Sequence, residues 1–302
     1  MRIVVLGPQR WPTLDSVVRT LDLSGPVATV TAGWQERESD DAELDALLGG
    51  RSVNLGLHAR WQDVLTRDPE YAAAELEHRA ALRELQELYL VQLDGTLHGL
   101  REVGRHGGSR AEIRDAARAD SEAAVRLVDG RHLARVRAAR AAFEARWRPG
   151  ERLAAAEHRA EVGRVLDAAA ALVVAGGHVG VLLHALRLFG VGAPPVVIAW
   201  SAGAMALTER VLLFHDRVPH GPAHPEFLDS GLGWIPGCVL LPHARRRLRT
   251  DDRTRMAELA ARAAPAGCVV LDDGVRLDLG ESRVLPPGAR VIGRDGRIGD
   301  LT

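Results

Sequence analysis

The sequence predicts an α/β protein with a mostly parallel sheet, helices on both faces of that sheet, and a long inserted helical hairpin. Two observations support this prediction. Short apolar segments alternate with helical segments at both ends of the chain, and such alternation is typical of parallel sheets covered on both faces. Between about residues 60 and 148 the strand-like segments disappear, and two long helical patterns take their place.

The first sixty residues contain three apolar segments with strand character. They span residues 2–6, 27–31 and 52–58, and helical segments at 13–21 and 40–48 separate them. Gly49 and Gly50 end the second of these helices, since glycine commonly follows the last turn of a helix. The order of elements therefore predicts two β-α repeats and a third strand.

The middle of the chain has helical periodicity only. Apolar residues fall at steps of three and four in two stripes: Leu82, Leu85, Tyr89, Leu93, Leu97 and Leu100, then Leu133, Val136, Ala139, Phe143 and Trp147. The glycine-rich segment 104–109 separates them, which predicts an antiparallel pair of helices. We interpret residues 60–148 as a hairpin inserted into a single domain of residues 1–302. A solvated arm or dimer contact is the first interpretation, and a lid over an active site is the alternative.

The second half returns to alternating elements. The pattern predicts helices at 151–170 and 179–188, strands at 172–175, 195–200, 238–241 and 268–271, and a helix that opens at residue 201. Short antiparallel strands and turns are expected over the last thirty residues.

Composition excludes several classes of protein. The chain of 302 residues is 46% hydrophobic and has a formal net charge of −1, so neither nucleic-acid binding nor a membrane-spanning helix is predicted. The apolar start of the chain is too short for a secretory signal, which makes the cytoplasm the expected location. Cys238 and Cys268 lack metal-ligand spacing and are expected to be buried and reduced. No cofactor or metal is predicted.

Ser201 stands at the most informative point of the sequence. The apolar strand 195–200 runs directly into Ser201-Ala202-Gly203, and a helix begins there. A serine on such a turn presents its hydroxyl above the edge of the sheet. The N-terminus of the following helix favours developing negative charge nearby. This pattern predicts a nucleophile.

Two further strand ends supply partners for that hydroxyl. His243 follows the strand 238–241, and Asp272 and Asp273 follow the strand 268–271. Carboxyl ends of parallel strands meet at one edge of a sheet, so His243 is predicted as the base and one aspartate as its orienting partner. Gly177 follows the strand 172–175, and its N–H together with that of Ala202 is a candidate oxyanion hole.

Weaker features surround these residues. His215, Asp216, His220 and His224 cluster in one loop without regular metal-ligand spacing, so a solvated loop is favoured over substrate contact or zinc. Arg245 opens a run of arginines after His243; such a run is usually solvated, and a clamp for a substrate carboxylate is the sharper interpretation.

These motifs resemble the peptidase E (aspartyl dipeptidase) and cyanophycinase family of the class I glutamine amidotransferase-like superfamily. The resemblance rests on Ala175-Gly-Gly-His178, Ala199-Trp-Ser-Ala-Gly-Ala204, Pro242-His243, Asp272-Asp273-Gly274 and the segment 227–237. It implies a class I glutamine amidotransferase-like fold, with Ser201 as nucleophile, His243 as base and Asp273 as the acid. Apart from the resemblance, His178, Arg245 and Asp272 are candidate substrate-binding residues. Aspartate replaces the family's usual glutamate, His178 replaces an amide residue, and the hairpin is foreign to the small dipeptidases.

The sequence therefore favours a serine-type peptidase acting on a small peptide or amide. The alternative is a non-catalytic binding or assembly protein on the same fold, forming homo-oligomers through the hairpin. An α/β-hydrolase-type esterase is disfavoured, because that fold places its acid before its histidine and here the best acid follows it.

Overall fold

The computed structural model describes residues 1–9, 13–107, 110–214 and 224–301. A six-stranded sheet lies at its centre, in the order β10-β1-β5-β4-β2-β3. Strands β1 to β5 run parallel, and β10 pairs antiparallel with β1. These strands are β1 Arg2–Leu6, β2 Val27–Val30, β3 Ser52–Asn54, β4 Ala171–Val174, β5 Val196–Trp200 and β10 Arg276–Gly280. The predicted α/β class with a mostly parallel sheet is confirmed.

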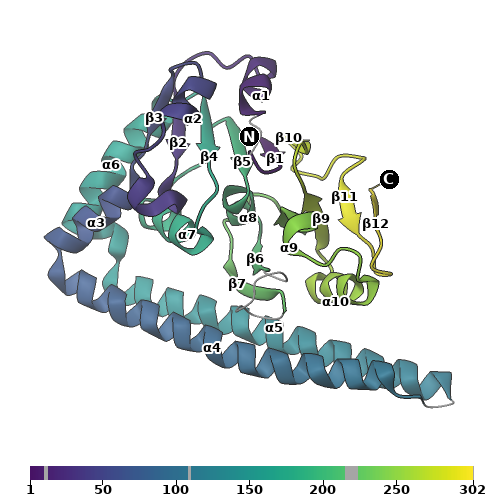
Figure 1. Ribbon diagram of the computed structural model, residues 1–302. Helices are drawn as coiled ribbons and strands as arrows, with labels where there is room; N and C mark the ends of the chain where they lie inside the picture. Colours follow the sequence, from purple (N-terminus) through teal and green to yellow (C-terminus); the bar gives the residue numbers. More distant parts are fainter. Residues whose placement is uncertain (10–12, 108–109, 215–223, 302) are drawn as a thin grey trace.

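Helices cover both faces of this sheet (Figure 1). Alternate residues of each strand point to opposite faces. One face packs on α1 (Leu14–Thr20) and α2 (Ala42–Leu47). The other packs on α3 (Leu57–Arg67), α6 (Leu153–Ala168), α7 (Val179–Leu188) and α8 (Ala202–Leu207). Short 3₁₀ segments, η1 Ala32–Arg37 and η2 Pro149–Glu151, complete this part of the chain.

The predicted strand at 52–58 is shorter in the structure. β3 ends at Asn54, and α3 begins at Leu57. The carboxylate of Glu38 accepts hydrogen bonds from the backbone N–H groups of His58 and Ala59, both at 2.9 Å. Because these bonds satisfy free donors of the first helical turn, the apolar residues after Asn54 start a helix instead of extending the strand.

Two long helices cross beneath the α/β body (Figure 1). They are α4 Pro69–Arg105 and α5 Ala111–Trp147, and neither is interrupted at its glycines. Asp68 separates α4 from α3: its carboxylate accepts a hydrogen bond from the N–H of Tyr71 at 3.1 Å, and Pro69 occupies the first turn. The hairpin therefore begins at Pro69, and residues 57–67 form a separate helix.

A second sheet stands beside the first. It has the order β12-β11-β9-β8, with β8 Cys238–Pro242 parallel to β9 Gly267–Leu271 and with β11 Arg290–Ile292 and β12 Ile298–Asp300 antiparallel. The strands before His243 and Asp272 thus belong to this sheet and not to the one that carries Ser201. The elements that were not predicted include β6 Arg210–Leu213, β7 Glu226–Ser230 and α10 Arg253–Ala263. A short helix, α9 Ala244–Arg247, follows β8.

Within the described ranges, no helix combines the length and the apolar character needed to cross a membrane. Cys238 and Cys268 are buried free thiols, and burial raises the pKa of each to about 12.

Candidate active site

Ser201 occupies the turn between β5 and α8. Its backbone angles are φ 50° and ψ −123°, a combination that residues with side chains seldom adopt. β5 lies in the interior of the sheet, between β1 and β4. The turn therefore holds the half-buried Ser201 hydroxyl above the carboxyl edge of the sheet, as the sequence predicts for a nucleophile elbow.

Close packing of backbone explains the small residues around Ser201. A Cβ on Gly203 would lie 2.2 Å from the carbonyl oxygen of Val174, and one on Gly176 would lie 2.9 Å from the Cβ of Ser201. The turns after β4 and β5 thus touch each other directly. Any side chain at these two glycines would push them apart.

Gly177 lies in the turn after β4, with φ +113° and its Cα facing the turn after β2. A Cβ there would lie 2.2 Å from the carbonyl oxygen of Gly33, and the next N–H, that of His178, donates to the same oxygen at 2.7 Å. Among the described residues, no acceptor forms a hydrogen bond with the N–H group of Gly177 or with that of Ala202. Two backbone donors are therefore available beside Ser201, as an oxyanion hole requires.

His243 follows β8 and lines the same cavity as Ser201, with a volume of about 670 Å³. Its backbone is left-handed, with φ 58°, and its N–H donates to Leu271 O of β9 at 3.0 Å. Burial and the nearby positive charge of Arg247 lower the pKa of His243, while Asp273 opposes that shift. A neutral imidazole is therefore available to accept a proton near pH 7.

The geometry brings Ser201 and His243 to one cavity but joins them by no hydrogen bond among the described residues. Apo catalytic sites often have such loose contacts, which tighten when substrate binds. Asp273 is exposed, and it acts on His243 through its charge alone. Asp272 accepts a hydrogen bond from the N–H of Arg245 at 3.0 Å and forms an ion pair with its guanidinium at 3.4 Å.

Of the predicted substrate contacts, only His178 lines the cavity. Its Nδ1 accepts a hydrogen bond from the N–H of Val181 at 3.2 Å, so the proton of the neutral ring lies on Nε2. Arg245 is exposed and holds Asp272. Arg247, two residues further along α9, lines the cavity instead, because residues two positions apart point to nearly opposite sides of a helical turn.

Several cavity residues were not predicted. They come from distant segments: Gln9, Trp34, Trp200, Phe214 and Leu228. Gln9 and Trp34 follow β1 and β2 at the same sheet edge as Ser201. Their positions after parallel strands could therefore have predicted that they line the cavity. Phe214 and Leu228 belong to the β6–β7 region, which was not recognised as a hairpin.

The predicted histidine loop lies largely outside the described residues, which include neither His215, Asp216 nor His220. His224 is described; its Nδ1 lies 3.2 Å from a guanidinium nitrogen of Arg101, and its Nε2 lies 3.3 Å from Asp94. Elsewhere in the described chain, no group of three or more His, Cys, Asp or Glu side chains is arranged to hold a metal ion.

Comparison with known proteins gives little further information. No protein family matches the chain, and no curated protein matches it by sequence. Among solved structures, the chain is similar to the crystal structure of a peptidase from an acI-B1 Actinobacterium. The alignment covers 100% of this chain and 93% of that chain, with 11% identity and a TM-score of 0.44. A likeness this distant establishes neither a shared fold nor a shared activity.

Proposed function

We propose that this chain is a serine-type hydrolase that cleaves a peptide or amide bond, with Ser201 as nucleophile and His243 as general base. One observation carries the proposal. Ser201 is held in a strained turn at the end of a central strand, and it shares a cavity of about 670 Å³ with a histidine from a different sheet. A hydroxyl is a weak nucleophile at neutral pH, so a neighbouring base is the feature that makes attack feasible.

The chemistry follows from this arrangement. The Oγ of Ser201 attacks the carbonyl carbon while His243 takes its proton, and the N–H groups of Gly177 and Ala202 stabilise the oxyanion that forms. His243 then protonates the leaving amine, and water hydrolyses the acyl-enzyme by the same route. Asp273 favours the imidazolium that forms in both steps, because its negative charge raises the pKa of His243.

A fluorophosphonate probe tests this proposal. Intact mass spectrometry is expected to detect one phosphonyl group per chain, and peptide mapping is expected to place it on Ser201. Ser201→Ala should abolish labelling, and His243→Gln should slow it by two or more orders of magnitude, as loss of a general base does. Ser16→Ala is the matched control, because Ser16 is an exposed serine of α1 and lines none of the cavities at the site.

A second candidate is a non-catalytic binding or assembly protein that forms homo-oligomers through the hairpin. The pairing of Asp272 with Arg245 favours it, because that carboxylate does not orient His243. This candidate predicts that the probe leaves Ser201 unmodified, and that sedimentation velocity detects an oligomer that shortening of the hairpin dissociates.

A further inference from the structure

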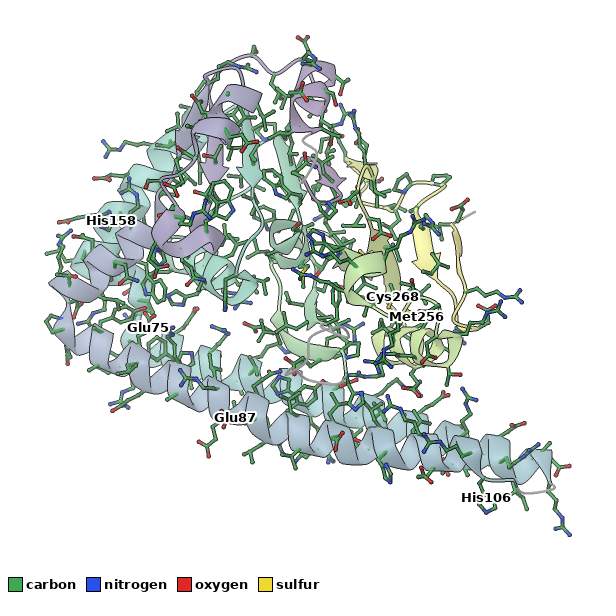
Figure 2. The ribbon with its side chains drawn as sticks, viewed as in Figure 1. Glu75, Glu87, His106, His158, Met256 and Cys268 are labelled. Atoms are coloured by element: carbon green, nitrogen blue, oxygen red, sulfur yellow. The ribbon has the colours of Figure 1, made fainter. Side chains whose placement is uncertain are left out.

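The cavity at Ser201 continues beneath the hairpin. A second cavity of about 340 Å³ shares His178, Gly180 and Leu228 with it. A third, of about 210 Å³, shares His78, Arg140 and His184 with the second. The hairpin helices α4 and α5 form one wall, and α7 and β7 form the other. Figure 2 places the buried Glu75 of α4 between the hairpin and the body, in this region.

Positive charge predominates in the second cavity. Arg79 and Arg83 of α4 and Arg140 of α5 line it, and Asp229 is its one carboxylate among the described lining residues. Asp229 is buried and binds two guanidinium groups, Arg140 at 2.7 Å and Arg187 at 2.8 Å. The buried carboxyl of Glu75 lies behind this lining, 3.2 Å from the Nε2 of His184, and burial raises its pKa. The arginines therefore outnumber the carboxylates in and around this cavity.

Three of these arginines have guanidinium N–H groups that remain available to bind a ligand. Among the described residues, no carboxylate lies within 4.0 Å of Arg79 or Arg83, and the guanidinium of Arg79 lies 5.0 Å above the ring of Trp61. The Nε of Arg140 is buried and has no hydrogen-bond partner. A guanidinium group can bind a carboxylate through two parallel hydrogen bonds. Guanidinium donors without a protein acceptor are therefore suited to bind an anionic group of a ligand.

Two of the histidines that line the second cavity, His78 and His184, add little charge. Burial lowers the pKa of His78 to about 4 and that of His184 to about 3. Both rings are therefore neutral near pH 7. The positive charge comes from the arginines and persists over the whole physiological range.

We infer that the space beneath the hairpin is a substrate subsite that binds an anionic group distant from the bond cleaved at Ser201. This inference rests on the proposed function only in placing the cleaved bond at Ser201. The substrate is then an extended chain that runs from Ser201 past His178 to Arg79, Arg83 and Arg140, and it is longer than a dipeptide. The hairpin serves as a fixed wall of the binding cleft.

Three capped tripeptides test this inference by isothermal titration calorimetry. The measurements use the Ser201→Ala protein, which lacks the proposed nucleophile, so that binding is measured without cleavage of the peptide. Succinyl-trialanine amide carries its carboxylate on the N-terminal side, acetyl-trialanine carries it on the C-terminal side, and acetyl-trialanine amide is neutral. At least one charged peptide is expected to bind at least fivefold more tightly than the neutral one. The double substitution Arg79→Gln/Arg83→Gln should remove about fivefold to tenfold of that affinity.

The matched control is Arg131→Gln/Arg135→Gln, which removes two exposed arginines of α5 that line none of the three cavities. This control variant should retain the preference for the charged peptide over the neutral one. Equal binding of all three peptides, no binding by any of them, or equal losses in the two double variants would overturn the inference. If the charged peptide binds as expected but the wild-type protein takes up no fluorophosphonate, the subsite stands and the proposed hydrolase fails.

Discussion

At the scale of single residues, the backbone of Ser201 is informative only together with its surroundings. Gln35 has nearly the same angles, φ 59° and ψ −123°, without any nucleophilic group. A strained conformation costs on the order of 1–3 kcal/mol and persists only where neighbouring structure enforces it. At Ser201 that structure is the contact between the turns after β4 and β5, and the hydroxyl it presents faces a cavity and a histidine.

The pH dependence of probe labelling depends on His243. Its neutral form is the base, so the rate is expected to fall as pH decreases through the lowered pKa of this residue. The midpoint should lie below 6.5, the ordinary value for histidine. Arg247→Met removes a positive charge that lowers this pKa, so the midpoint should move to higher pH.

Arg245→Met is the control for that measurement. Arg245 is exposed and pairs with Asp272, and it is not among the groups that shift the pKa of His243. Stopped-flow or quenched labelling from pH 4 to pH 8 gives all three profiles. Coincident profiles for wild type and Arg247→Met would contradict the assignment of the midpoint to His243.

Gly203 is expected to tolerate no side chain. A Cβ at this position would lie 2.2 Å from Val174 O, so Gly203→Ala should reduce the free energy of unfolding by about 1–3 kcal/mol and abolish labelling of Ser201. Gly130→Ala is the contrasting change. Gly130 lies within α5 with open space around it, and alanine there should stabilise the helix by about 0.5–1 kcal/mol. Urea denaturation measures both changes.

At the scale of elements, the hairpin is attached to the body by a buried polar network. Arg262 of α10 binds Asp129 of α5 through two hydrogen bonds of 2.9 Å, and Tyr89 of α4 donates to the same carboxylate at 2.7 Å. The Nη1 of Arg262 also donates to Pro225 O at 2.6 Å. All three side chains are buried. These contacts fix the hairpin against the body.

Breaking this network should cost much more than breaking a surface ion pair. Arg262→Met leaves Asp129 as an uncompensated buried charge, and we expect a loss of about 3–5 kcal/mol in the free energy of unfolding. Arg118→Met removes an exposed pair with Glu122, separated by 3.0 Å, and should cost less than about 0.5 kcal/mol. Similar losses in the two variants, measured by guanidinium denaturation, would show that the buried network does not hold the hairpin.

The sequence predicted the elements around Ser201 well because their apolar periodicity is strong. It did not predict that β8 and β9 form a separate sheet, since strand order depends on pairing between distant segments. The end of β3 was misplaced because the cap from Glu38 comes from about twenty residues earlier in the chain. Arg245 was predicted to lie near the substrate, whereas Arg247 lines the cavity. Because α9 is only one turn long, its sequence has no periodicity that could predict which side faces the cavity.

At the scale of the whole molecule, the hairpin extends past the body. Its far end, where His106 lies, projects beyond the second sheet (Figure 2). An ion pair of 3.0 Å between Arg101 and Glu258 is the outermost polar contact described between α4 and the body. The apolar cluster of Leu93, Leu97, Leu100 and Val125 joins the two helices up to that point. Among the described residues, none beyond Arg101 in α4 and none at the start of α5 lines the cavity at Ser201.

Shortening the tip separates its roles. Replacing residues 104–117 with a Gly-Ser turn should leave the labelling rate of Ser201 unchanged within about twofold, since the contacts of Arg101 remain. Sedimentation velocity on the same variant tests assembly through the tip. A large fall in labelling would mean that the tip reaches an active site, and would contradict its assignment as a non-catalytic extension.

The most direct test of the central claim is a crystal structure of the protein after reaction with diisopropyl fluorophosphate. We expect the phosphorus to be bonded to the Oγ of Ser201, with the phosphoryl oxygen within about 3.1 Å of the N–H groups of Gly177 and Ala202 and the ring of His243 beside Oγ. An unmodified Ser201, or an adduct whose phosphoryl oxygen points away from both N–H groups and from His243, would contradict the account.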